Sequence, residues 1–168
     1  VETTQHGLML LVLGCNNAQG YGIARPMPES DFVQWLKSYS PNQEWISCGK
    51  KERTLKETKL KLFRLSLSRW LSYFEENILS SQDNDSAWPI MIRRNCLCGY
   101  WIERAQQEKL FDITWLESVD AAHESIHLIA ENILTKYQNG QLDDAREGLD
   151  ELQSSFITIK NILDSVGD

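Results

Sequence analysis

From residue 55 onward, apolar side chains recur at the three-and-four spacing of an amphipathic helix. Residues 55–80 carry one such stripe, formed by Leu60, Phe63, Leu67, Trp70, Leu71, Phe74 and Ile78. The period continues in residues 88–108, in a segment that starts at Asp112 or Thr114 and stops at Asn139-Gly140, and in residues 143–164. This spacing gathers the apolar side chains on one face of each helix. We therefore predict four helices with short connections, folded as an antiparallel four-helix bundle.

Each predicted helix has its own apolar set. Residues 88–108 supply Ile90, Ile92, Leu97, Trp101 and Ile102, and the following helix supplies Val119, Ile126, Ile129 and Ile133. The last helix turns six positions inward: Ala145, Leu149, Leu152, Phe156, Ile159 and Leu163. A polar break at residues 82–86 separates the first two helices. Together these helices define a predicted domain at residues 55–168.

Residues 1–38 follow a different pattern. A leucine-rich stretch predicts a short helix that Gly14 ends, because glycine tolerates the left-handed conformation found after many helices. Residues 18–24 indicate a short extended segment, closed by two prolines that cannot continue a ladder. A second helix is expected from Ser30, with Phe32, Val33 and Leu36 facing inward. Residues 39–54, which are mostly polar, are predicted to form a linker.

The composition limits the kinds of partner that the chain is expected to bind. Acidic residues outnumber basic ones by 24 to 17, which gives a net charge of −7 and argues against nucleic-acid binding. No apolar run approaches the roughly 18–20 residues of a membrane span, so we expect no membrane contact. The four cysteines lack the spacing of a disulfide framework. We therefore expect a cytoplasmic location, where reduced thiols are available as metal ligands.

The first 28 residues contain four short motifs. They are Val1-Glu2-Thr3, Leu13-Gly14-Cys15-Asn16, Gln19-Gly20-Tyr21 and Arg25-Pro26-Met27-Pro28. This stretch closely resembles the end of the EAL domain, the cyclic-di-GMP phosphodiesterase family of bacteria. The resemblance implies that residues 1–38 are a short α/β remnant of a TIM-like barrel.

The same resemblance assigns Glu2 and Gln19 to the active site of the parent enzyme. The family's metal-binding carboxylates and lysine lie upstream of the motifs seen here, and two residues cannot build a two-metal site. Mg²⁺ or Mn²⁺ is therefore expected only in the intact EAL domain, and we expect this chain to be non-catalytic. In this chain, Glu2 and Gln19 are then expected to be surface polar residues.

The bundle carries a second group of residues that suits a metal. Cys96 opens the pattern C-x-x-G-x-W, and His123 and His127 are four residues apart, so they share one face of a helix. A thiolate and two imidazoles suit Zn²⁺, which is usually bound by four ligands. These features resemble the chemoreceptor zinc-binding (CZB) domain, a four-helix bundle of bacterial receptors and cyclic-di-GMP enzymes.

The fourth ligand of that family is a histidine three residues before a tryptophan in the first helix. Trp70 is present here, but the ligand position holds Leu67. Two interpretations stay open. Either the bundle binds no metal, or it holds a weakened zinc site that is completed by water or by a donor such as Cys98 or Glu124.

These patterns lead to two hypotheses on function. The first is a regulatory or sensory region for signal transduction at the C-terminus of a cyclic-di-GMP phosphodiesterase. The second is a purely structural or dimerisation bundle that stabilises the EAL domain without metal or sensing. Expected partners are the upstream EAL domain, GGDEF or sensor domains of the parent, and a second copy of the chain. A third function, hydrolysis by Cys96 with a histidine, lacks a recognisable oxyanion site.

Overall fold

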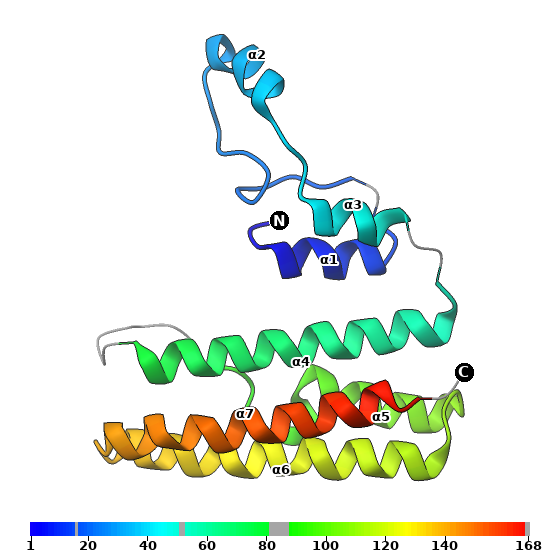
Figure 1. The fold of residues 1–168 in the computed structure, drawn as a ribbon, viewed down its shortest axis with the longest axis vertical. Coiled ribbons are helices and arrows are strands. Elements are labelled where there is room, and N and C mark those ends of the chain that lie inside the picture. Colours follow the sequence, from blue (N-terminus) through cyan, green and yellow to red (C-terminus); the bar gives the residue numbers. More distant parts are fainter. Residues whose placement is uncertain (16, 51–52, 81–87, 167–168) are drawn as a thin grey trace. The chain divides into compact units, whose positions relative to one another are not determined.

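The computed structural model describes residues 1–15, 17–50, 53–80 and 88–166, and every regular element in these ranges is a helix (Figure 1). The elements are α1 (Thr4–Val12), α2 (Glu29–Ser38), α3 (Gln43–Lys50), α4 (Leu55–Leu79), the 3₁₀-helix η1 (Arg93–Asn95), α5 (Leu97–Glu108), α6 (Ile113–Gln138) and α7 (Leu142–Asp164). The prediction of a mostly α chain is confirmed. Among these helices, none has both the length and the apolar character needed to cross a membrane.

The predicted extended segment at residues 18–24 is wrong. Residues 21–23 form a tight turn, in which the N–H groups of Ile23 and Ala24 both donate to the carbonyl of Gly20. A strand needs a neighbour that accepts its backbone hydrogen bonds, and a turn satisfies these groups locally. The α/β character expected for residues 1–38 is therefore not seen in the described part of the chain.

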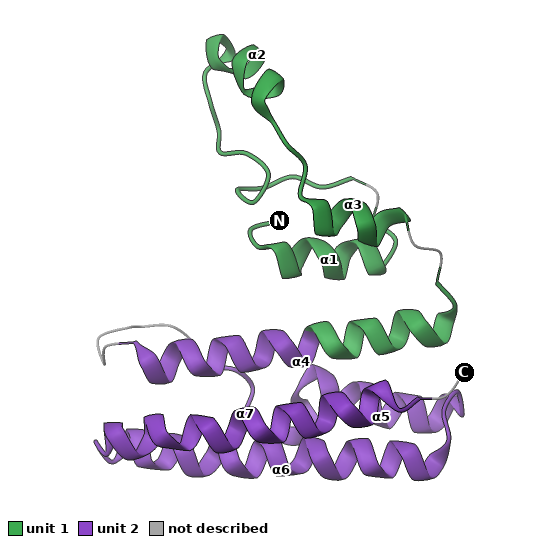
Figure 2. Ribbon diagram, viewed as in Figure 1, with its two compact units in different colours: residues 1–65 green, residues 66–168 purple. Residues whose placement is uncertain are grey.

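The chain divides into two compact units, Val1–Leu65 and Ser66–Asp168, with the division inside α4 (Figure 2). In the first unit, α1 packs against α3, and Leu8, Val12, Cys48 and Leu65 form a small apolar cluster. Trp45 of α3 donates from Nε1 to the Thr4 carbonyl at 2.9 Å. Gly7 leaves room for this indole, because a Cβ there would lie 2.5 Å from the ring.

Helix α3 lies inside residues 39–54, where we predicted a linker. Asn42 stabilises its start, since Oδ1 accepts hydrogen bonds from the N–H groups of Glu44 and Trp45. Such a cap satisfies donors that a short helix would otherwise leave unpaired. The polar residues that suggested a linker are thus partly the capping signal of a helix.

Helix α2 differs from the prediction in two ways. It follows Pro28 directly, so Ser30 lies in its first turn and is not its N-cap. The residues expected to face inward, Phe32, Val33 and Leu36, are 49%, 57% and 57% exposed. Its aromatic contacts are local, because Trp35 packs against Phe32 and Tyr39.

The second unit is built around α6 and α7, which pack side by side (Figure 1). The turn between them contains Gly140 with φ of +78°, a conformation that suits glycine. Trp115 near the start of α6 donates from Nε1 to the Ile162 carbonyl near the end of α7 at 2.9 Å, which makes the two helices antiparallel. Of the two predicted starts, Asp112 and Thr114, it is Asp112 that caps α6. All six positions predicted to face inward on α7 are buried.

Helix α5 is shorter than the predicted helix at residues 88–108. It begins at Leu97, and Ile90, Ile92 and Leu97 are exposed. Cys96 sets this start, because its backbone is extended and its Sγ accepts the hydrogen bond of the Gly99 N–H as an N-cap does. The chain instead makes the single turn η1 before α5 begins. The predicted polar break at residues 82–86 lies outside the described residues.

Candidate metal centre

The two histidines lie on the buried face of α6. His123 and His127 are only 1% and 4% exposed, and they continue the apolar row that includes Val119, Ile126 and Ala130. One helical turn separates them, so their rings stack edge to face with centroids 4.7 Å apart. The sequence pattern that buries this face therefore also brings two imidazoles together in the core.

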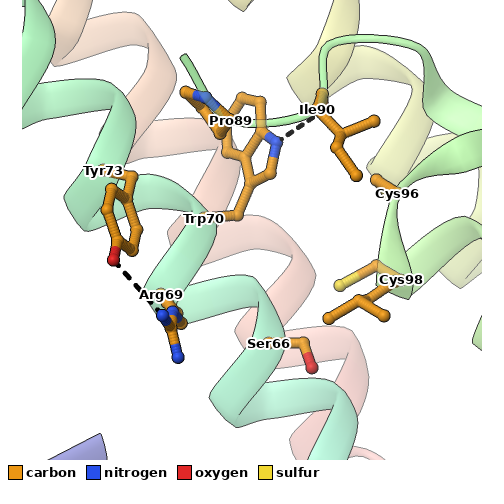
Figure 3. Close-up of a pocket in the computed structure, with 9 residues that line it drawn as sticks. Ser66, Arg69, Trp70, Tyr73, Pro89, Ile90, Cys96 and Cys98 are labelled. Atoms are coloured by element: carbon orange, nitrogen blue, oxygen red, sulfur yellow. Dashed lines mark hydrogen bonds between the residues drawn. The ribbon is translucent and has the colours of Figure 1, made fainter. Parts of the chain in front are cut away.

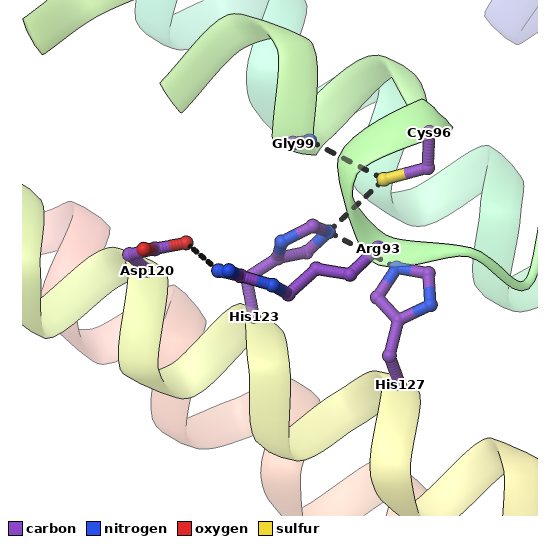
Figure 4. A network of polar contacts seen from close by, with 6 residues as sticks. All are labelled: Arg93, Cys96, Gly99, Asp120, His123 and His127. Atoms are coloured by element: carbon purple, nitrogen blue, oxygen red, sulfur yellow. Dashed lines mark hydrogen bonds and ion pairs between the residues drawn. The ribbon is translucent and has the colours of Figure 1, made fainter. Parts of the chain in front are cut away.

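Cys96 approaches the imidazoles from the start of α5 (Figure 4). It is the N-cap of that helix, and its Sγ accepts a hydrogen bond from the Gly99 N–H at 3.3 Å. The same sulfur lies 3.1 Å from His123 Nε2. Gly99 is needed here because a Cβ would lie 2.1 Å from the Arg93 carbonyl oxygen. The glycine of C-x-x-G-x-W thus lets η1 fold against α5 and position the thiol.

The three side chains offer a donor set that fits zinc. Cys96 Sγ, His123 Nε2 and His127 Nε2 are buried and lie within 4.8 Å of one another, with 3.2 Å between the two nitrogens. Tetrahedral zinc would hold two nitrogens about 3.3 Å apart, and nitrogen and sulfur about 3.6 Å apart. The 3.2 Å between the nitrogens and the 3.1 Å between Cys96 Sγ and His123 Nε2 are within about 0.5 Å of these values. The predicted cluster of Cys96, His123 and His127 therefore forms in the structure.

Hydrogen bonds around the cluster favour metal binding at His127. The Nδ1 of His127 lies 2.6 Å from the Met91 carbonyl oxygen. A carbonyl only accepts, so Nδ1 carries the proton and Nε2 directs its lone pair toward the cluster. His123 Nδ1 is buried without a hydrogen-bond partner among the described residues. The ion pair between Arg93 and Asp120 lies beside this ring (Figure 4).

The pKa values of the two thiols at the start of α5 shift in opposite directions. A hydrogen bond from Cys98 lowers the pKa of Cys96 far below its usual value of 9.0, and His123 and His127 lower it further against the effect of burial. The same hydrogen bond and burial raise the pKa of Cys98 well above 9.0. The chemistry that follows is a Cys96 thiolate, which is the form that binds metal, next to a protonated Cys98.

We expect Cys96 to make the metal-free protein more stable as the pH rises. The pKa of Cys96 is lower in the folded state than in the unfolded state, where the thiol has its ordinary pKa. The folded state therefore gains up to about 1.4 kcal/mol per pH unit between these two pKa values, and loses that stability as the pH falls. Unfolding free energies at pH 6 and pH 8 should differ less in Cys96→Ser. An equal pH dependence in both proteins would contradict a folded-state thiolate.

A pocket of about 190 Å³ lies between the middle of α4 and the start of α5 (Figure 3). Trp70 forms one wall, donating from Nε1 to the Ile90 carbonyl at 2.9 Å. The indole also packs against the His127 ring, with centroids 5.1 Å apart. Leu67, one turn earlier on α4, is buried. Position 67 therefore holds a buried apolar side chain that offers no lone pair to a metal.

Two of the EAL-like motifs in the first unit also meet. The Gly22 N–H donates to the Val1 carbonyl at 2.9 Å, so the turn after Gln19 lies against the segment that holds Glu2. Gly20 has φ of +135°, and a Cβ there would lie 2.4 Å from backbone atoms of Val1. Glu2 and Gln19 themselves are exposed. Only the backbones of the two motifs are therefore brought into contact.

Sequence reasoning missed one contact of the cluster. The Met91 carbonyl is a backbone group, and no residue type indicates its role. The second thiol does have a sequence signal, because Cys98 follows Cys96 at a helix start and is among the donors that the sequence offers.

Comparison with known proteins relates part of the chain to cyclic-di-GMP hydrolysis. A probable cyclic di-GMP phosphodiesterase, PdeN of Escherichia coli (strain K12), is 50% identical to the chain over 42 residues. The match covers 24% of this chain and 8% of that protein, so the chain spans a small part of its relative. No protein-family description and no solved structure matches the chain.

Proposed function

We propose that the unit Ser66–Asp168 is a zinc-binding regulatory module, with the four-helix architecture of CZB domains, in the C-terminal region of a cyclic-di-GMP phosphodiesterase. The observation that carries this proposal is the buried convergence of Cys96, His123 and His127. Three buried donors that point at one another cost free energy unless each is satisfied, and a zinc ion satisfies all three.

The link to the phosphodiesterase rests on a motif resemblance and on a relative. The motifs of residues 1–28 resemble the end of an EAL domain, and the 50% identity to PdeN names the same activity for a relative. Hydrolysis then belongs to the parent enzyme with its Mg²⁺ or Mn²⁺, and this chain contributes Glu2 and Gln19 without being a catalyst itself. The upstream EAL domain and a second copy of the chain are the partners that follow from this arrangement.

Zinc would act here by joining two elements. Cys96 precedes α5, whereas both histidines belong to α6, so a bound ion crosslinks the start of one helix to the middle of another. Loss of the ion would release α5 and η1 from α6. Such a change in helix packing is the kind of local event that a neighbouring domain can detect.

Metal content tests the proposal directly. Protein purified without a polyhistidine tag should contain about one equivalent of zinc, because the three donors are already positioned. A Cys96→Ser/His127→Ala variant should contain none, and elemental analysis of both proteins measures the difference. Circular dichroism of the variant would show that it remains helical. Zinc-free wild-type protein that also fails to take up added zinc would refute the proposal.

A second function, a structural or dimerisation bundle without metal, is favoured by Leu67. A buried leucine supplies no lone pair at the position where the family has its fourth ligand. An activity assay of the parent enzyme distinguishes the two proposed functions. Regulation predicts that phosphodiesterase activity changes with zinc and is altered by Cys96→Ser, whereas a scaffold predicts that neither treatment matters while the helices remain folded.

A further inference from the structure

The cluster supplies three protein ligands, and two nearby residues remain as sources of a fourth. Glu124 follows His123 on α6, but its side chain is exposed and lies off the buried face. Cys98 is buried on the first turn of α5. Burial therefore distinguishes the two donors that the sequence left open, and it favours the second thiol.

The local backbone turns both thiols to the same side. Cys96 has an extended conformation, and the helix begins immediately after it. Leu97, between the two cysteines, is 64% exposed. Cys96 and Cys98 therefore both point inward, and a hydrogen bond joins their sulfurs. Figure 3 shows Cys98 directed into the pocket toward Ser66 and Trp70 of α4.

We propose that Cys98 is the fourth zinc ligand and replaces the histidine that Leu67 has displaced, so the centre has two cysteines and two histidines. This inference rests on the proposed function. Two thiolates on one zinc ion lie about 3.8 Å apart, a separation comparable to that of two hydrogen-bonded sulfurs. Cys98 is not part of the triangle of three donors, so a change of its χ1 rotamer must bring its sulfur to the ion. Two-cysteine, two-histidine sets are common at structural zinc sites.

Cobalt titration of the purified chain tests this ligand assignment, because the thiolate-to-cobalt absorption scales with the number of bound thiolates. Wild-type protein should show the intensity of two thiolates. Cys98→Ser should show half of it, together with an affinity for cobalt and zinc that is lower by about 10²-fold. Cys48→Ser is the matched control, since Cys48 is also a buried cysteine but belongs to the first unit. It should bind like the wild type.

A double variant distinguishes loss of a ligand from misfolding of the protein. Leu67→His/Cys98→Ser restores the fourth ligand from α4, so it should regain most of the lost affinity while keeping the absorption of one thiolate. Equal spectra and affinities for wild type and Cys98→Ser would overturn the assignment while leaving a three-ligand zinc site intact. Wild-type protein that binds neither metal would instead remove the proposed function, and this assignment with it.

Discussion

Saturating zinc should raise the melting temperature of the unit Ser66–Asp168 by roughly 15 °C. Zinc at about a thousand times its dissociation constant stabilises a folded state by about 4 kcal/mol when the unfolded chain does not bind it. In a domain of this size, each kcal/mol shifts the melting temperature by about 4 °C or more. Cys96 precedes His123 by 27 residues, so the unfolded chain does not hold the thiol beside the two histidines. Thermal unfolding followed by circular dichroism, with and without zinc, measures the shift.

His123→Ala provides the control for this result. It removes the ligand that contacts both Cys96 and His127, so the zinc-dependent shift should disappear. His6→Ala changes a histidine of the first unit and should leave the shift unchanged. A shift that survives in His123→Ala would show that zinc stabilises the protein through some other site.

Gly99→Ala should destabilise the second unit by about 1–3 kcal/mol and weaken metal binding at the same time. The added Cβ would lie 2.1 Å from the Arg93 carbonyl oxygen, and backbone cannot yield as a flexible side chain can. Relief requires η1 to move away from α5. Because Gly99 also donates to Cys96 Sγ, that movement displaces the thiol. Chemical denaturation and zinc affinity measure the two effects.

Gly49→Ala is the comparable change at a glycine where an added Cβ meets no close atom. Gly49 lies in α3, and the nearest atom to its Cβ would be a Leu11 methyl group at 3.8 Å. Alanine is the better helix former, so this variant should be neutral or slightly stabilising. Similar effects of the two substitutions would show that the contact with Arg93 does not constrain Gly99.

Long helices with a continuous apolar row were predictable from the sequence. The six inward positions of α7 are all buried, because a stripe of that length has one stable orientation in a packed unit. Asp112, one of the two starts predicted for α6, is the N-cap of that helix. In both cases, the local helix signal and the packing of the apolar face favour the same structure.

Short elements were predicted less well, because local signals conflict there. Helix α3 combines a capping asparagine with polar residues, and contact between Trp45 and α1 decides the outcome. Residues 88–92 have helical periodicity, but the turn η1 and the extended backbone of Cys96 delay the helix to Leu97. A periodic pattern does not show which residue will cap a helix.

The candidate metal centre was predictable in its residues but not in its surroundings. The spacing of His123 and His127 follows from helix geometry alone, and Cys96 was placed on a neighbouring helix by its motif. The structure adds that Cys96 caps α5 and does not lie within it. It also gives the contact of Trp70 with His127 and the pairing of the two thiols, which depend on how three elements pack.

The partner of His127 Nδ1 has an evolutionary consequence, because it is the main-chain oxygen of Met91. Every amino acid carries such an oxygen, so residue 91 can change its identity while the imidazole keeps its tautomer. Selection at this point acts on the path of the connecting segment. Related proteins can therefore differ throughout that segment and still orient the ligand in the same way.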